Sequence, residues 1–135
     1  MTFKYEELEV WRLAKDLVKG SYRRFRSFPS FEQFALAAQG RRAVTSIALN
    51  IAEGSGRQTD RDFALFINRA VTSLQETDAV LKIAVELGYL TQDSYDSLAP
   101  LIEKEYFKLV AFEKALRGRS LTRTRQSGSG SNRGS

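Results

Sequence analysis

The chain of 135 residues contains no cysteine and no histidine. Without cysteine it cannot form a disulfide, a thiolate zinc site or a cysteine nucleophile. Without histidine it lacks the commonest general base and the commonest transition-metal ligand, and carboxylate-bridged metal sites in helical bundles also use Glu-x-x-His pairs. We therefore expect a protein that is not an enzyme and that holds no metal and no cofactor.

Long apolar runs and an export signal are also lacking. Residues 1–10 contain three glutamates, whereas a signal peptide begins with positive charge, and no apolar stretch approaches the roughly 20 residues that cross a bilayer. We expect a cytoplasmic protein that makes no contact with membranes. Only two prolines are present, Pro29 and Pro100, so long helices are permitted.

The formal net charge of +5 is unevenly distributed. Residues 1–116 contain 16 basic and 16 acidic side chains, so the whole excess lies in the five arginines of 117–135. That tail is rich in arginine, serine and glycine and has few apolar residues to offset the entropy of ordering. We predict a folded domain over 1–117 and a disordered tail over 118–135.

Within the neutral body, residues 1–59 have a net charge of +4 and residues 60–116 a net charge of −4. This asymmetry is compatible with a basic face that binds phosphates, or with a basic side of one subunit that meets the acidic side of the next. Salt-bridged neighbouring helices on a solvated surface are the third interpretation.

Apolar residues recur at steps of three and four in four segments, which predicts four amphipathic helices. These helices are expected from Tyr5 to Phe28, from Phe31 or Glu32 to Glu53, from Thr59 or Asp60 to Leu87, and from Gln92 to Leu116. Pro29, Gly54 with Gly56, and Gly88 are the expected helix terminators, and Pro100 predicts a kink or a restart in the last helix. The connections are short and no strand pattern occurs, so we predict an all-α, antiparallel up-down four-helix bundle.

The expected core follows from the same spacing. Small residues dominate the second helix, where Gly40 indicates close approach of a neighbouring helix. The third helix has two series of apolar positions seven residues apart, typical of bundle packing; they are Phe63, Ala70, Thr77 and Ala84, and Ile67, Leu74 and Leu81. The core side expected for the fourth helix is Tyr95, Leu98, Ile102, Tyr106, Leu109, Phe112 and Leu116.

A line of polar residues follows one face of the second helix, at steps of three and four: Gln39, Arg42, Ser46, Asn50, Glu53 and Arg57. Such a line more often marks a solvated face or a polar seam between helices of one chain. The alternative is a face that meets a second subunit or a nucleic-acid backbone. In that case Gln39, Ser46, Asn50 and Glu53 form the oligomer or motif face, and the candidates for phosphate binding are Arg41, Arg42, Arg57 and Arg61.

The run from Arg41 to Arg57, with Asn50-Ile51-Ala52-Glu53-Gly54 at its centre, resembles a bacterial four-helix-bundle family encoded in intervening sequences of large-subunit ribosomal RNA genes. Leu8-Glu9-Val10-Trp11, Ser27-Phe28-Pro29 and the segment from Phe63 to Tyr89 extend the resemblance over residues 3–116. It implies a small cytosolic bundle without established enzyme activity, assembling as a ring-like homopentamer.

A branch related to that family serves as the accessory protein of diversity-generating retroelements. It uses a basic surface to bind nucleic acid and a reverse transcriptase, which by analogy makes Arg41, Arg42, Asn50, Glu53 and Arg57 site candidates. Two hypotheses follow. The first is a non-enzymatic homo-oligomer that binds RNA or DNA through its arginines. The second is a scaffold for self-assembly and an unknown protein partner, with no affinity for nucleic acid.

Overall fold

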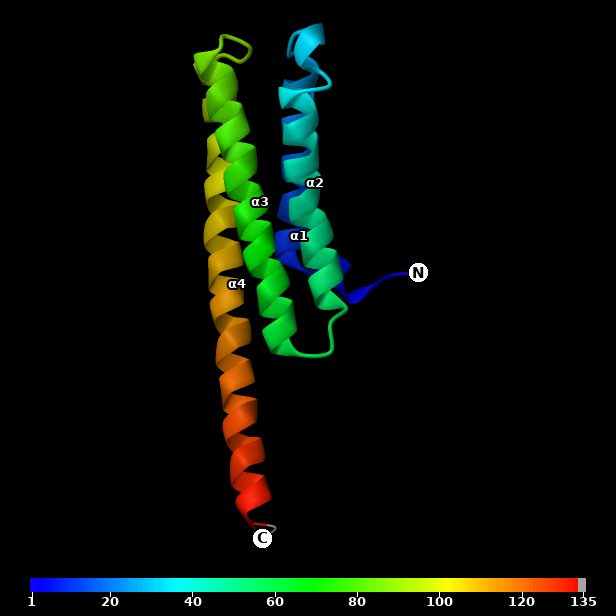
Figure 1. Ribbon diagram of the computed structural model, residues 1–135, viewed down its shortest axis with the longest axis vertical. Coiled ribbons are helices and arrows are strands. Elements are labelled where there is room, and N and C mark those ends of the chain that lie inside the picture. Colours follow the sequence, from blue (N-terminus) through cyan, green and yellow to red (C-terminus); the bar gives the residue numbers. More distant parts are fainter. Residues whose placement is uncertain (134–135) are drawn as a thin grey trace.

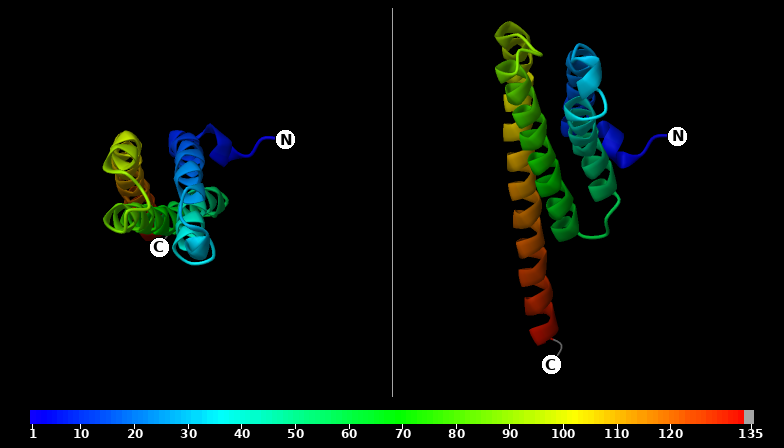
Figure 2. Two further views of the ribbon diagram at one scale, coloured as in Figure 1. Left: turned by 90° about the horizontal axis from the view of Figure 1, so that it is seen from above. Right: turned by 45° about the horizontal axis from the view of Figure 1, so that its top comes forward.

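Four helices pack in sequence order in the computed structural model, which describes residues 1–133, with side chains as far as Arg123 (Figure 1). The helices are α1 (Glu9–Arg26), α2 (Leu36–Ser55), α3 (Asp60–Glu86) and α4 (Gln92–Arg133), and two short 3-10 turns, Lys4–Glu7 and Ser30–Glu32, precede α1 and α2. Each helix contacts the next along the chain, and α1 also contacts α4. Seen from above, α1 and α2 lie beside α3 and α4 (Figure 2). The predicted all-α up-down bundle is confirmed.

The bundle core contains the apolar positions that the helical spacing selects. All seven predicted heptad positions of α3 are buried, and Ala37, Val44, Ile47 and Ile51 line the inner face of α2. Gly40 lies against Phe25 of α1, and a Cβ atom at this position would be 2.5 Å from the Cζ atom of that ring. The predicted close approach at Gly40 is therefore confirmed.

The ends of α3 and the start of α4 follow ordinary capping chemistry. The Thr59 hydroxyl accepts a hydrogen bond from the Asp62 backbone N–H at 3.1 Å, as expected of an N-cap. Gly88 has a φ of +78°, a backbone conformation that glycine adopts without strain, and it ends α3 as predicted. Thr91 caps α4 through the Ser94 N–H.

Two helices begin later than predicted. The chain before α1 forms the turn Lys4–Glu7, in which the Glu6 carboxylate accepts from the Phe3 N–H at 2.7 Å, and Leu8 is extended. Before α2, the Gln33 side-chain amide donates to the carbonyl oxygens of Phe25 and Phe28. Local hydrogen bonds therefore hold both segments outside the α-helices. The expected start of α1 at Tyr5 and that of α2 at Phe31 or Glu32 are wrong.

Gly54 has a role other than the predicted one of terminating α2. It lies inside the last turn of the helix, and a Cβ atom there would be 2.6 Å from the Cβ atom of Phe66 and 2.9 Å from a ring carbon of Phe63. Close packing between α2 and α3 explains this glycine, and α2 itself ends one residue later, at Ser55.

The fourth helix differs most from the expectation, because it neither restarts at Pro100 nor ends near Leu116. It is one continuous helix to Arg133 and projects beyond the other three (Figure 1). The Asp60 carboxylate, at the start of α3, forms ion pairs with Arg119 at 3.2 Å and Arg123 at 3.0 Å, which tie the continuing helix to the bundle. The tail predicted to be disordered is helical as far as Arg133, and residues 134–135 lie outside the described residues.

No helix in the described part of the chain is both long enough and apolar enough to cross a membrane.

Candidate functional site

The middle of the predicted polar line faces α3 of the same chain. The Asn50 amide donates to the carbonyl oxygen of Ser46 at 2.8 Å and to its hydroxyl oxygen at 2.9 Å. The Ser73 hydroxyl of α3 donates to the same Ser46 oxygen, and the Thr77 hydroxyl donates to the Ser73 carbonyl oxygen. Ser46, Asn50, Ser73 and Thr77 thus form a polar seam between α2 and α3, the interpretation that competed with a binding face.

The two ends of the line are exposed. The Gln39 amide reaches the Glu76 carboxylate on α3 at 3.2 Å. At the other end, Glu53 and Arg57 form an ion pair at 3.2 Å, with 60% and 44% of their side chains exposed. Arg42 lies on the surface beside Gln39, where both line a shallow depression. The polar line is therefore one partly buried seam with a solvated patch at each end.

The four arginines proposed from the sequence do not converge. Arg41 donates to the Gln33 carbonyl oxygen at 2.6 Å, so it holds the connection between α1 and α2. Arg41 lies on α2, whereas Arg57 follows the end of that helix, and the helical stretch from residue 41 to residue 55 alone is roughly 21 Å long at 1.5 Å per residue. Arg57 lies in the connection from α2 to α3 and Arg61 at the start of α3, beyond the opposite end of α2.

That end of the bundle gathers further arginines that the sequence reasoning did not single out. We call it the arginine end, and it comprises Arg57, Arg61, Arg69, Arg117, Arg119 and Arg123. The guanidinium carbon atoms of Arg57 and Arg69 lie 4.4 Å and 4.6 Å from the centroid of the Phe66 ring. Arg61 and Arg117 line one pocket of about 360 Å³ together with Ser120 and Leu121. The helix spacing could not reveal this cluster, because its members come from separate segments of the chain.

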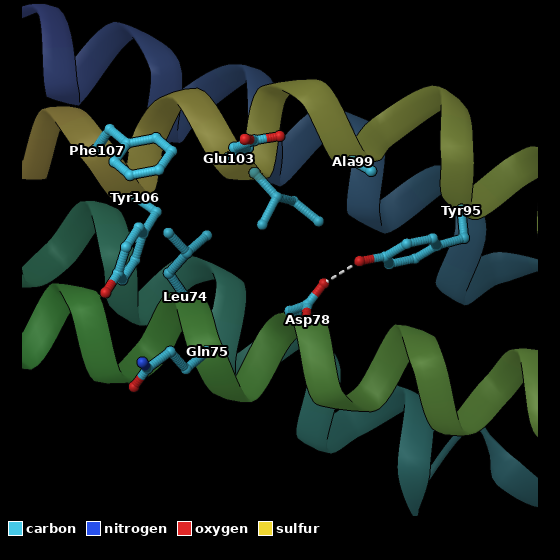
Figure 3. A pocket seen from close by; sticks show the side chains of 9 residues that line it. Leu74, Gln75, Asp78, Tyr95, Ala99, Glu103, Tyr106 and Phe107 are labelled. Atoms are coloured by element: carbon cyan, nitrogen blue, oxygen red, sulfur yellow. Dashed lines mark hydrogen bonds between the residues drawn. The ribbon is translucent and has the colours of Figure 1, made fainter.

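A second pocket, of about 370 Å³, lies between α3 and α4 (Figure 3). The Tyr95 hydroxyl donates to one Asp78 carboxylate oxygen at 2.5 Å, and the Lys82 ammonium group contacts the other at 2.8 Å. Burial, followed by the hydrogen bond to Asp78, raises the pKa of Tyr95, and the same carboxylate raises the pKa of Lys82. Both Asp78 oxygens are therefore engaged, one by Tyr95 of α4 and the other by Lys82 of the same helix, α3.

The apolar wall of this pocket includes Leu74, Ile102 and Phe107, and Phe107 is 61% exposed. Figure 3 shows Phe107 and Tyr106 side by side at one end, with the pair of Asp78 and Tyr95 at the other. Tyr106, expected in the core, is instead 36% exposed at the pocket rim.

The core position assigned to Tyr106 belongs to Glu105, which is 0% exposed. Neither of its carboxylate oxygens has a hydrogen-bond partner within the described residues. Burial, with a smaller contribution from Glu9, raises the pKa of Glu105 to about 8. The signal was present in the sequence, because position 105 continues the alternating steps of four and three that run from Leu98 to Leu116.

The fold and the polar seam define the class of protein: an up-down four-helix bundle whose α2 and α3 join through small and polar residues. The chain belongs to the 23S rRNA-intervening sequence protein family, whose model matches residues 6–111. This match confirms the resemblance carried by the segment from Arg41 to Arg57.

Among solved structures, the chain is similar to a protein of unknown function from the S23 ribosomal protein family of Bacteroides thetaiotaomicron. The two share 23% sequence identity with a TM-score of 0.72, over 78% of this chain and 98% of the other. This likeness shows the fold. No curated protein matches the chain.

Proposed function

We propose that this protein is a non-enzymatic, self-associating bundle that binds the phosphate backbone of RNA or DNA through the arginine end. The observation that carries the proposal is the pocket shared by Arg61 of α3 and Arg117 of α4. None of the described residues that line it is acidic. Two guanidinium groups beside one pocket suit a phosphate, since each presents several donors in a planar fork.

Arg117 donates through Nε to the Glu113 carboxylate at 2.9 Å, and its two terminal nitrogens make no hydrogen bond within the described residues, so they are available to a phosphate. The ion pair of Arg57 is more exposed. Arg57 is 44% exposed and its partner Glu53 is 60% exposed. Pairs this exposed contribute about 0 to 1 kcal/mol, so a polyanion can replace the carboxylate at small cost. Arg57 and Arg69 also lie against the Phe66 ring, which limits their freedom before any ligand arrives and lowers the entropy lost on binding.

The test is a salt titration of binding to a fluorescein-labelled single-stranded RNA, followed by fluorescence anisotropy with the full-length chain. Every protein in the series carries Arg125→Gln and Arg133→Gln. RNA binding by these two tail arginines then does not mask the effect of the other substitutions. The Arg61→Ala/Arg117→Ala variant should bind more weakly at low salt. Its slope of log affinity against log salt should fall by about one to two, because each lost phosphate contact on single strands contributes about 0.7.

The matched comparison is Arg42→Ala/Lys104→Ala, which removes the same charge from two exposed positions outside the arginine end. This variant should retain the affinity and the salt slope of its parent. Absence of RNA affinity at low salt in the parent would refute the proposal, as would equal losses in the two variants. Circular dichroism on each protein checks that the fold is retained.

Self-association is supported by charge and by exposed aromatic residues. The basic half of the body corresponds to α1 and α2, and the acidic half to α3 and α4. Phe34 on the basic side is 95% exposed, and Phe107 on the acidic side is 61% exposed. Opposite charge favours a contact between unlike sides of two copies, which generates a closed ring if the rotation allows it. Family resemblance implies a pentamer.

The competing function is a scaffold that self-associates and binds another protein without affinity for nucleic acid. The same exposed aromatic residues favour it. Both functions require self-association, which sedimentation velocity at several protein and salt concentrations tests. We expect oligomers that dissociate as the salt concentration rises. A strict monomer at every concentration would contradict both functions, whereas an oligomer without RNA affinity would support the scaffold.

A further inference from the structure

The outer face of α1 presents a line of basic side chains that the sequence analysis did not single out. We call it the α1 stripe, and it comprises Arg12, Lys15, Lys19, Arg23 and Arg26, all exposed. At 100° and 1.5 Å per residue these five positions fall within an arc of about 80° and extend over roughly 21 Å. The regular spacing therefore makes one straight cationic track rather than a scatter of surface charges.

Most of this charge has no partner in the fold. Lys19, Arg23 and Arg26 make no hydrogen bond or ion pair within the part of the chain that the structure describes. The contrast is Arg24, which turns towards α4 and donates to the Ser94 carbonyl oxygen at 2.9 Å and to the Ser97 hydroxyl at 2.7 Å. Arg24 therefore joins α1 to α4, whereas the residues of the α1 stripe are exposed to solvent.

Few acids offset the stripe from its own helix. Glu9 is drawn towards α4 by an ion pair with Lys108 at 3.3 Å. Asp16 borders the stripe and makes no ion pair in the described structure. The Arg12 guanidinium donates to the Glu7 carbonyl oxygen and retains its charge. Five cations against one bordering acid leave a local excess of positive charge.

We propose that the α1 stripe is a second binding surface for the phosphate backbone of a nucleic acid, separate from the arginine end. The inference rests on the proposed function for its partner class and adds the residues of α1 to it. A duplex carries a phosphate charge about every 1.7 Å along its axis with both strands counted, so a straight track of roughly 21 Å meets several phosphates where the winding strands pass it. The repeat of charge along a straight helix matches a polymer of evenly spaced anions.

A lipid surface fits the stripe less well. Helices that lie on membranes carry exposed Trp, Phe or Leu next to their basic residues. None of the exposed large apolar residues of the described chain belongs to α1, and Trp11 and Tyr22 are only partly exposed. The stripe therefore offers charge without an apolar anchor, which favours a hydrated phosphate backbone as the ligand.

The experiment compares two full-length variants with the same loss of charge. The stripe variant is Lys15→Gln/Lys19→Gln/Arg23→Gln. The control is Lys4→Gln/Lys104→Gln/Lys114→Gln, three exposed lysines outside both basic surfaces. Both are measured by anisotropy with labelled single-stranded RNA at increasing salt, with thermal unfolding recorded for each protein. The substituted side chains are exposed, so both variants should fold.

We expect the stripe variant to lose about tenfold or more in affinity at low salt, with a salt slope smaller by about two. The control should stay within about twofold of the wild type. If the wild type binds RNA and the stripe variant binds equally well, the inference about α1 fails and the proposed function stands. If the wild type shows no RNA affinity at low salt, both fail.

Two further probes separate other partners of a cationic track. One is a vesicle containing phosphatidylserine, and the other is a polyglutamate peptide of the same charge as the RNA. Binding of either probe with RNA-like affinity, lost in the stripe variant, would overturn the assignment to nucleic acid. Weaker binding of both probes, with RNA binding dependent on the stripe, supports it.

Discussion

Glu105 gives the sharpest physical prediction, because a fully buried carboxyl group must change its proton affinity when the chain unfolds. Its pKa is about 8 in the folded protein, against an ordinary value of 4.5. Below about pH 4.5 both states hold the proton and the group has no effect. Between the two pKa values the folded chain keeps a proton that the unfolded chain releases, so stability falls as pH rises.

The size of the effect follows from the shift. Each pKa unit corresponds to about 1.4 kcal/mol, so the group costs about 3 kcal/mol of unfolding free energy near pH 7 and about 4 to 5 kcal/mol above pH 8. The Glu105→Gln variant keeps the shape of the side chain and removes its titration. Its stability relative to wild type should therefore rise by about 2 to 3 kcal/mol between about pH 5 and pH 7.

The assay is urea unfolding of both proteins at several pH values, monitored by far-UV circular dichroism at one protein concentration. A fixed concentration matters because self-association would otherwise change the apparent stability. The control is Glu103→Gln, which neutralises an exposed acid two residues away on α4 and should show no such pH-dependent gain. A difference between Glu105→Gln and wild type that stays constant across this range would refute the reasoning, because burial would then not perturb the proton equilibrium.

Three other substitutions test packing and capping by the same unfolding measurement. Gly40→Ala gains about 1 kcal/mol of helix propensity but forces a Cβ atom against the buried Phe25 ring, so we expect a net loss of about 1 to 2 kcal/mol; unchanged stability would contradict the close contact. Gly118→Ala is the matched case, because nothing lies within 4 Å of the new Cβ atom, and α4 should gain up to about 1 kcal/mol. Thr59→Ala removes the N-cap of α3 and should cost about 1 kcal/mol, whereas Thr59→Ser should cost little.

Helical periodicity predicted the architecture because the core of this bundle is built from repeated spacing. The heptads of α3 could be identified from sequence, since a residue seven positions along returns to nearly the same face. The starts of α1 and α2 could not, because side-chain hydrogen bonds such as those of Gln33 decide them. Glu105 was missed for a different reason: a polarity pattern assigns a glutamate to the surface even where the spacing places it inside.

The arginines show what helical periodicity cannot predict. Periodicity gives the angular position of a residue on its helix, but not which neighbouring helix covers that angle. Ser46 and Asn50 share a face with Arg57, yet α3 covers the first two and leaves Arg57 near the surface. The five residues of the α1 stripe satisfy the same spacing rule and are exposed. In this chain the side chains around Asn50 stabilise the contact between α2 and α3, so a nucleic-acid surface is better sought in exposed cations outside that signature, such as Arg61, Lys19 and Arg23.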